Sequence, residues 1–376
     1  MKKFWTTFGA AIVGTIGVLL ATKNGFLLKA VGKNLTKKPL TPSIDDAPHF
    51  DINPVPNGIP IDWDIDEKYN TTVLPQSVIE NLEETKASSL LVIKNGRILH
   101  EKYWNGHHSG SLMNSFSMAK GILGMLVGAA IDEGTIKSED QLFSGFYPEF
   151  AEDEFGKHLT LKHLMQMQAA LDWAEEYHHP FAPNSRQYFV EDLEKQVFER
   201  KLREMPGIKY EYQSAAPQLL GFALRKAVGK SLASYLSEKI WIPLGMNYSA
   251  KWSIDSKGME KAFCCIHATA RDLAKIGLIL LHDGEFQGKQ IISKDFIKKM
   301  KEPTSANDAF GYSVWVNKDC HVKHQFLYGF LGQFLVVIPE KQLIIVKTGH
   351  DNNLPVDDKL RPLQVSFLAE ELCRIF

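Results

Sequence analysis

Apolar and polar positions near residue 90 follow the pattern of a β-hairpin that leads into a buried helix. Residues 90–93 are an uninterrupted apolar run, Asn95-Gly96 is typical of a two-residue turn, and residues 98–104 return as a second strand. Residues 115–131 are rich in Met, Leu, Gly and Ala and begin with serines that can cap a helix. The pattern therefore predicts strand, turn, strand and then a helix that is largely buried.

Further along the chain, the pattern changes from helical to strand-like. Helical periodicity dominates from residue 159 to about residue 244. Strand character returns at residues 334–338 and 343–346, which flank a short turn, and a closing helix is expected at about residues 360–376. Strands from both ends of the chain must then meet in one sheet around the helical middle.

This order of elements predicts an α+β domain over residues 74–376. We expect an antiparallel sheet flanked by helices, with a mostly helical subdomain inserted at about residues 135–250. The seam between the sheet and the helical subdomain is the natural place for a cleft.

The first 22 residues have the charge and apolarity of a signal peptide or membrane anchor. Lys2 and Lys3 precede an apolar run over residues 4–21, and Leu19 stands where a cleavable signal would have a small residue. An uncleaved anchor is therefore favoured, with the domain bound to a membrane or exported to the periplasm. The lysines that follow the run oppose this orientation, since positive charge prefers the cytoplasmic side.

Residues 23–73 read as a linker that is first basic and then rich in proline. Proline at the density found between residues 39 and 60 favours an extended spacer. Phe50, Ile52 and Trp63 are apolar residues through which this stretch can attach to the domain.

Composition excludes several classes of partner. The 376 residues are 44% hydrophobic and 23% charged, and the net charge of −1 provides no field to collect nucleic acid. The four cysteines include no Cys-x-x-Cys pair, so neither a disulfide framework nor a thiolate zinc site is expected. The adjacent pairs His107-His108 and His178-His179 lack a suitably spaced carboxylate, so we expect no metal and no cofactor.

Ser117 and Lys120 are the strongest candidates for chemistry. A serine at the first turn of a buried helix has backbone N–H groups beside it, and a lysine three residues later lies on the same helix face. A desolvated lysine tends to lose its proton and can then act as a base toward the serine. The alternative is an ordinary helix cap beside a surface lysine, but the flanking residues, such as Ile122 and Leu123, are apolar. The sequence therefore predicts a nucleophile and its base.

Tyr212 and Ser214 form a second candidate motif. A tyrosine close to a buried ammonium can have a lowered pKa and exchange protons with the nucleophile or the leaving group. Ser214 can offer its hydroxyl to Lys120 or to a substrate amide. The plainer interpretation is a tyrosine that only packs and forms hydrogen bonds. Tyr210, two positions earlier, also competes with Tyr212 for the functional role.

These segments resemble the serine beta-lactamase and penicillin-binding superfamily, in particular its class C-like branch with esterases, D-amino-acid peptidases and 6-aminohexanoate-oligomer hydrolases. The likeness extends from about residue 89 to residue 376. The resemblance implies that Ser117 is acylated, that Lys120 and Tyr212 shuttle protons, and that the Ser117 N–H forms half of an oxyanion hole. The matching segments are residues 114–120, 206–221, 241–246, 268–274 and 332–341.

Two departures from the family pattern bear on the substrate. Ser214 stands where the second motif commonly has Asn. The third motif, a cation followed by x-Gly on the strand that borders the site, is spelled by residues 347–349, but we expect these residues after the last hairpin strand and pointing away from the cleft. Residues 327–329 fit the position better and have no cation. Gly329 and Phe330 are thus the expected substrate neighbours, and a neutral substrate is favoured.

The function that we expect is a two-step acyl transfer on a small ester or amide. Ser117 attacks the carbonyl, and an edge-strand N–H near Phe330 helps to hold the oxyanion. The alternative is a non-catalytic module that binds cell-wall peptide or beta-lactam on the same fold, which the missing cation favours. A plain membrane-anchored interaction protein is a third possibility.

Overall fold

The computed structural model describes residues 42–376 except residues 178, 180 and 352–354. The predicted signal or anchor at residues 1–22 and the basic part of the predicted linker lie outside this range. Within the described range, none of the helices has the length and apolarity that crossing a membrane requires.

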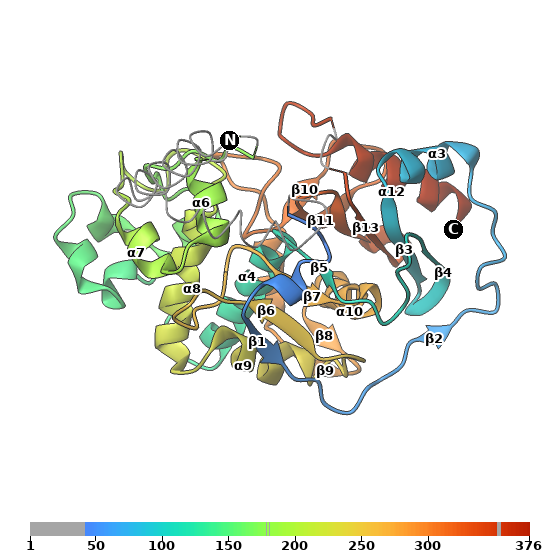
Figure 1. Ribbon diagram of the computed structural model, residues 1–376, viewed down its shortest axis with the longest axis horizontal. Coiled ribbons are helices and arrows are strands. Elements are labelled where there is room, and N and C mark those ends of the chain that lie inside the picture. The colour runs from blue at the N-terminus through green and yellow to red at the C-terminus, as the bar shows by residue number, and fades with distance from the viewer. Residues whose placement is uncertain (1–41, 178, 180, 352–354) are drawn as a thin grey trace, which may run out of the picture.

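A seven-stranded sheet built from both ends of the chain forms the centre of the fold, as the sequence predicts (Figure 1). Neighbouring strands run antiparallel, except that the short edge strand β2 pairs with β4 in parallel. The order across the sheet is β10 (Trp315–Asn317), β11 (His324–Gly329), β12 (Gln333–Ile338), β13 (Leu343–Gly349), β3 (Ala87–Lys94), β4 (Arg97–Tyr103) and β2 (Asp64–Ile65).

Both predicted hairpins are present in this sheet. Asn95 and Gly96 join β3 to β4 with φ values of 49° and 76°, the left-handed conformation that a tight hairpin turn requires. Strands β12 and β13 form the second hairpin, and all of their residues are buried. The strands that the apolar pattern identified are therefore those that hold the core together.

Helices cover the sheet on both faces. Helices α3 (Gln76–Glu84) and α12 (Leu363–Ile375) pack against β3 and β12, respectively. Helices α4 (Met118–Asp132) and α10 (Ala270–Leu281) contact the sheet from within the molecule (Figure 1). Nearly every residue of α4 is buried, because it lies between β11 and the helical part of the chain.

The middle of the chain is mostly helical and lies beside the sheet (Figure 1). Helix α8 contacts α4, α5, α7 and α9, which makes it the centre of this part. Two further strands, β8 (Glu285–Phe286) and β9 (Lys289–Gln290), form a small hairpin. The remaining helices are α5 (Leu161–Met165), α6 (Pro183–Phe189), α7 (Leu193–Phe198), α8 (Ala215–Val228), α9 (Leu232–Leu236) and α11 (Lys294–Met300).

A second sheet joins the proline-rich stretch to the domain. Its four strands lie in the order β1 (Ile52–Val55), β6 (Ala250–Ser253), β7 (Ile266–Ala268) and β5 (Met113–Asn114). Val55 is completely buried, and Phe50 and Trp63 pack against the core. The described part of the predicted linker is therefore folded onto the domain through the kind of apolar residue that its sequence offers.

Candidate active site

Ser117 lies directly after a turn that is fixed from both sides. Strand β5 ends at Asn114, and Ser115 exchanges two hydrogen bonds with Ile266 of β7, at 2.8 and 3.2 Å. Phe116, between Ser115 and Ser117, has a φ of 44°, a left-handed conformation that residues other than glycine seldom adopt. Strain of this kind persists only where the surroundings impose it, and it commonly marks functional sites.

Lys120 holds the hydroxyl of Ser117 directly. The Lys120 Nζ atom lies 2.7 Å from Ser117 Oγ and 2.9 Å from the carbonyl oxygen of Phe263. Ser117 occupies the cap position of α4 but makes no capping bond with its side chain, so the ordinary-cap interpretation does not apply. Lys120 is 2% exposed, and this burial lowers its pKa to about 8. Lys120 therefore gives up its proton more readily than an exposed lysine does.

The carbonyl that holds Lys120 comes directly before a disulfide between neighbouring residues. Cys264 and Cys265 are bonded to each other, and both are buried. A bond between these adjacent cysteines was not expected from the sequence, in which the four cysteines indicate no disulfide framework. It restrains the loop in which Phe263 presents its oxygen to the lysine.

Tyr212 completes a three-residue group with Ser117 and Lys120. The Lys120 ammonium lies 5.0 Å from the centre of the Tyr212 ring, and the Ser117 hydroxyl acts on the pKa of Tyr212. A lowered pKa was expected for this tyrosine, but burial raises the pKa of Tyr212 against the opposing effect of the Ser117 hydroxyl. The Glu175 carboxylate acts in the same direction as desolvation, so Tyr212 remains a neutral proton donor and Lys120 is the better base.

Ser214 faces Glu175 instead of Lys120 or an open substrate space. Its Oγ donates to Glu175 Oε1 at 2.6 Å, its backbone N–H donates to Oε2 at 2.9 Å, and the residue is 3% exposed. The expected role of Ser214 as a substrate contact does not fit this burial. A carboxylate is a stronger acceptor than a substrate amide would be, and it takes the hydroxyl.

Glu175 is a site residue that does not stand out in the sequence, where it is one of two adjacent acids in a polar stretch. Besides Ser214, it accepts hydrogen bonds from Trp173 Nε1 at 2.7 Å and from the Tyr177 hydroxyl at 2.9 Å. Its charge acts on Lys120, where it raises the pKa against the larger effect of burial. One signal in the sequence was Trp173, two residues before Glu175, because a buried indole N–H needs an acceptor nearby.

Gly329 and Phe330, the expected substrate neighbours, lie beside the turn that precedes Ser117. A side chain at Gly329 would place its Cβ 2.2 Å from the backbone oxygen of Ser115, so only glycine allows β11 to approach this closely. The Phe330 ring lies 5.7 Å from that of Phe116 and stacks at 5.2 Å on Tyr177, which is 45% exposed. Aromatic side chains thus border the site at this edge.

Lys347 points its charge into the protein interior. Residues 347–349 are the end of β13, not the segment after it, which corrects the expected boundary. The Lys347 Nζ atom donates to the carbonyl of Gly332 at 3.2 Å and lies 5.5 Å from the ring centre of Phe334. Its burial is complete and lowers its pKa to about 7. The Lys347 ammonium is therefore bound to the Gly332 carbonyl inside the protein and is not placed to anchor a substrate.

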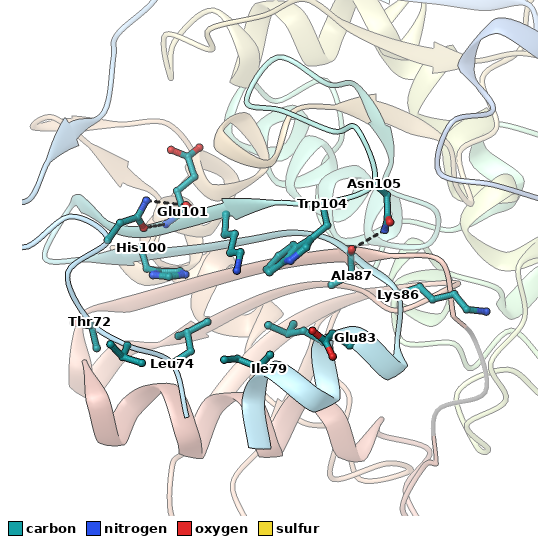
Figure 2. A pocket seen from close by; sticks show the side chains of 14 residues that line it. Thr72, Leu74, Ile79, Glu83, Lys86, Ala87, His100, Glu101, Trp104 and Asn105 are labelled. Atoms are coloured by element: carbon teal, nitrogen blue, oxygen red, sulfur yellow. Dashed lines mark hydrogen bonds between the residues drawn. The ribbon is translucent and has the colours of Figure 1, made fainter. Parts of the chain in front are cut away.

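A recess between α3 and β4 is separate from the group formed by Ser117, Lys120 and Tyr212. It has a volume of about 560 Å³ and is lined by α3, by β4 and by the chain before α3 (Figure 2). Ser117, Lys120 and Tyr212 are not among its lining residues. The candidate chemistry therefore lies at the start of α4 and not in this recess.

Comparisons with known proteins identify relatives of this chain and its fold. The chain is 26% identical to the 6-aminohexanoate-dimer hydrolase of Paenarthrobacter ureafaciens over 231 residues, which are 59% of this chain and only 58% of that relative. A structure from Bacillus anthracis, provisionally identified as a 6-aminohexanoate-dimer hydrolase, superposes with a TM-score of 0.74 at 22% identity, covering 88% of this chain and 92% of that one.

A D-stereospecific amidohydrolase from Streptomyces has the same fold, with a TM-score of 0.58 at 13% identity, covering 76% of this chain and 93% of that one. Family membership rests on a broader match, since the model of the Beta-lactamase family aligns with residues 76–369. The chain therefore belongs to the Beta-lactamase family and has the hydrolase fold of that family.

Proposed function

We propose that the protein is a serine hydrolase that cleaves a small, uncharged amide or ester through an acyl-enzyme intermediate. The observation that carries this proposal is the 2.7 Å contact between Ser117 Oγ and a buried lysine whose pKa is lowered to about 8. A surface lysine keeps its proton well above neutral pH, whereas burial makes it easier for Lys120 to release its proton and then to accept the one from Ser117 Oγ.

In the first step, the neutral amine of Lys120 accepts the Oγ proton while Oγ bonds to the carbonyl carbon and the carbonyl electron pair moves to oxygen. Collapse of this intermediate breaks the C–N or C–O bond, and the leaving group takes a proton from the Lys120 ammonium or the Tyr212 hydroxyl. Water then attacks the acyl group by the same route, releasing a carboxylic acid and restoring Ser117. Backbone N–H groups at Ser117 and near Phe330 would hold the oxyanion in both steps.

The substrate class follows from the groups that border the site. Tyr177 and Phe330 are aromatic, and residues 327–329 supply no cation for a carboxylate. Lys347, whose segment spells the family's cationic motif, is bound to Gly332 inside the sheet. A neutral acyl group with an apolar portion therefore fits better than a substrate with a free carboxylate beside the scissile bond. The relative from Paenarthrobacter is named for a linear amide that carries a free amine and a free carboxylate, so the substrate proposed for this chain keeps the linear amide and differs in its charge.

Hydrolysis of chromogenic esters and anilides tests this proposal. The wild type should release nitrophenol from a neutral p-nitrophenyl ester, and Ser117→Ala should abolish the release. Lys120→Arg retains the positive charge but cannot lose it, so it should reduce kcat/KM about 10²- to 10⁴-fold. A folded wild type with no turnover of esters or anilides would instead favour a non-catalytic binding module, the alternative that the missing cation suggests.

A further inference from the structure

Three side chains from distant segments converge at one end of the central sheet, outside the candidate active site. Asp45 precedes β1, His107 follows β4, and His350 follows β13. One ligand atom from each lies within 4.8 Å of the other two. Imidazole nitrogen and carboxylate oxygen at this separation are a donor set that suits a divalent transition metal.

The contacts of His107 require positive charge at its outer nitrogen, Nε2. Its Nδ1 lies 3.1 Å from the carbonyl oxygen of Trp104, which can only accept, so Nδ1 carries a proton. Its Nε2 lies 2.9 Å from Asp45 Oδ1, which is also an acceptor. A neutral ring would place two lone pairs against each other there. Either a second proton or a metal ion must lie between them, and the His350 ring, 5.8 Å from the His107 ring, supplies a further ligand for a metal.

Backbone contacts fix the loops that carry these ligands. Asn105, two residues before His107, donates its side-chain amide to the carbonyl of Ala87 at 3.1 Å, a bond drawn in Figure 2. The backbone N–H of His350 donates to the carbonyl of Lys86 at 3.2 Å. Both histidines are thus held against the start of β3. A carbonyl that orients the second nitrogen of a ligating histidine, as Trp104 does here, is a common support in metal sites.

We propose that Asp45, His107 and His350 form a Zn²⁺ site that clamps residues 43–46 to the end of the central sheet. Tetrahedral zinc with bonds of about 2.1 Å separates its ligand atoms by about 3.4 Å. The side chains therefore need only small rotations to close around the ion, with a fourth position left for water. Histidine with carboxylate, without thiolate, selects zinc over the hard ions calcium and magnesium.

The clamp would act on the strand that leads to the nucleophile candidate. The carbonyl of Ile44 accepts from the backbone N–H of Asn114 at 2.7 Å, and Asp46 accepts from the Tyr188 hydroxyl at 2.8 Å. Asn114 in turn accepts from the N–H of Phe116 at 2.9 Å. Zinc at Asp45 would thus hold in place the segment on which the turn before Ser117 rests.

Calorimetric titration of the tag-free full chain in detergent, stripped with EDTA and then given ZnCl₂, tests the site. One equivalent should bind with a micromolar or lower Kd, and Co²⁺ should give the visible absorption of a tetrahedral complex. His107→Ala, His350→Ala and Asp45→Asn should each weaken binding at least about 100-fold. His108→Ala is the matched control, an exposed neighbour outside the cluster, and it should bind like the wild type.

Zinc should also raise the Tm of the wild type and of His108→Ala but not of His350→Ala. Asp45→Asn keeps the shape of the side chain, so its zinc affinity tests the site even if a histidine variant does not fold. No saturable zinc binding to the wild type would overturn the proposal. Equal binding by the wild type, Asp45→Asn and any folded histidine variant would do the same, because the ion would then lie at other histidines.

Discussion

Replacing Glu175 by Gln removes one charge from the candidate active site and leaves the shape intact. Its Oε2 accepts from two N–H groups, those of Ser214 and of the Trp173 indole, and its Oε1 accepts from the hydroxyls of Ser214 and Tyr177. N–H groups only donate, whereas hydroxyls can also accept. The amide oxygen of Gln should therefore take the Oε2 position and its NH₂ group the Oε1 position, so that all four contacts persist.

The cost in stability follows from these contacts. Hydrogen bonds to charged groups contribute about 1.5–3 kcal/mol and neutral ones about 0.5–1.5 kcal/mol. Glu175 is half-buried, so solvent screens part of the difference, and we expect Glu175→Gln to cost about 1–2 kcal/mol. Glu175→Ala should cost about 3–5 kcal/mol, because it leaves the buried N–H and hydroxyl of Ser214 without an acceptor.

The effect on activity has a definite sign. The Glu175 carboxylate stabilises the Lys120 ammonium and so raises its pKa against burial. Removal of the charge must lower the pKa of Lys120, and the rise of kcat/KM with pH, expected near pH 8 in the wild type, should move to lower pH. The assay is ester hydrolysis from pH 5 to 10 with urea unfolding as the stability control. An unchanged or upward-shifted profile in a folded Glu175→Gln variant would refute this electrostatic role.

Three further substitutions test other parts of the account. Gly329→Ala forces a Cβ against the Ser115 carbonyl, so it should destabilise by about 1–3 kcal/mol and lower kcat/KM at least about 10-fold, whereas Gly145→Ala, which has room, should do neither. Lys347→Met should leave ester hydrolysis unchanged. Wild-type stability should rise with pH between about 7 and 10.5, where the unfolded chain binds a proton that folded Lys347 has released, and this slope should be missing from Lys347→Met. Arg271→Ala should cost about 3–5 kcal/mol in urea unfolding at pH 7, because Glu101, whose side chain is 3% exposed, loses both hydrogen bonds from the guanidinium. That cost should shrink in acid, where Glu101 can take up a proton; an equal cost at pH 4 and pH 7 would contradict the ion-pair explanation.

Local patterns in the sequence were sufficient for the hairpins and for the group around Ser117. The Asn95-Gly96 turn and the apolar runs on either side of it specify their conformation through short-range preferences, and the spacing of Ser117 and Lys120 places both on one helix face. The α+β fold followed from the order of these elements along the chain. The sheet topology and the family match over residues 76–369 confirm this fold.

Contacts between distant segments could not be predicted in this way. Glu175 looks like any exposed acid until Ser214 and Trp173 are brought to it, and Asp45 meets His107 and His350 only once the sheet has formed. The raised pKa of Tyr212 has the same origin, because desolvation depends on what surrounds the ring in three dimensions. The roles proposed for Ser117, Lys120 and Tyr212, and the predicted membrane or periplasmic location, remain predictions.

Intact-mass spectrometry after exposure to a fluorophosphonate tests the central claim most directly, since this reagent phosphonylates only an activated serine. The wild type should gain the mass of one adduct, Ser117→Ala should gain none, and the rate of labelling should rise with pH as Lys120 loses its proton. A folded wild type that gains no mass, or a Ser117→Ala variant that is labelled as fast as the wild type, would contradict the assignment of Ser117 as the nucleophile.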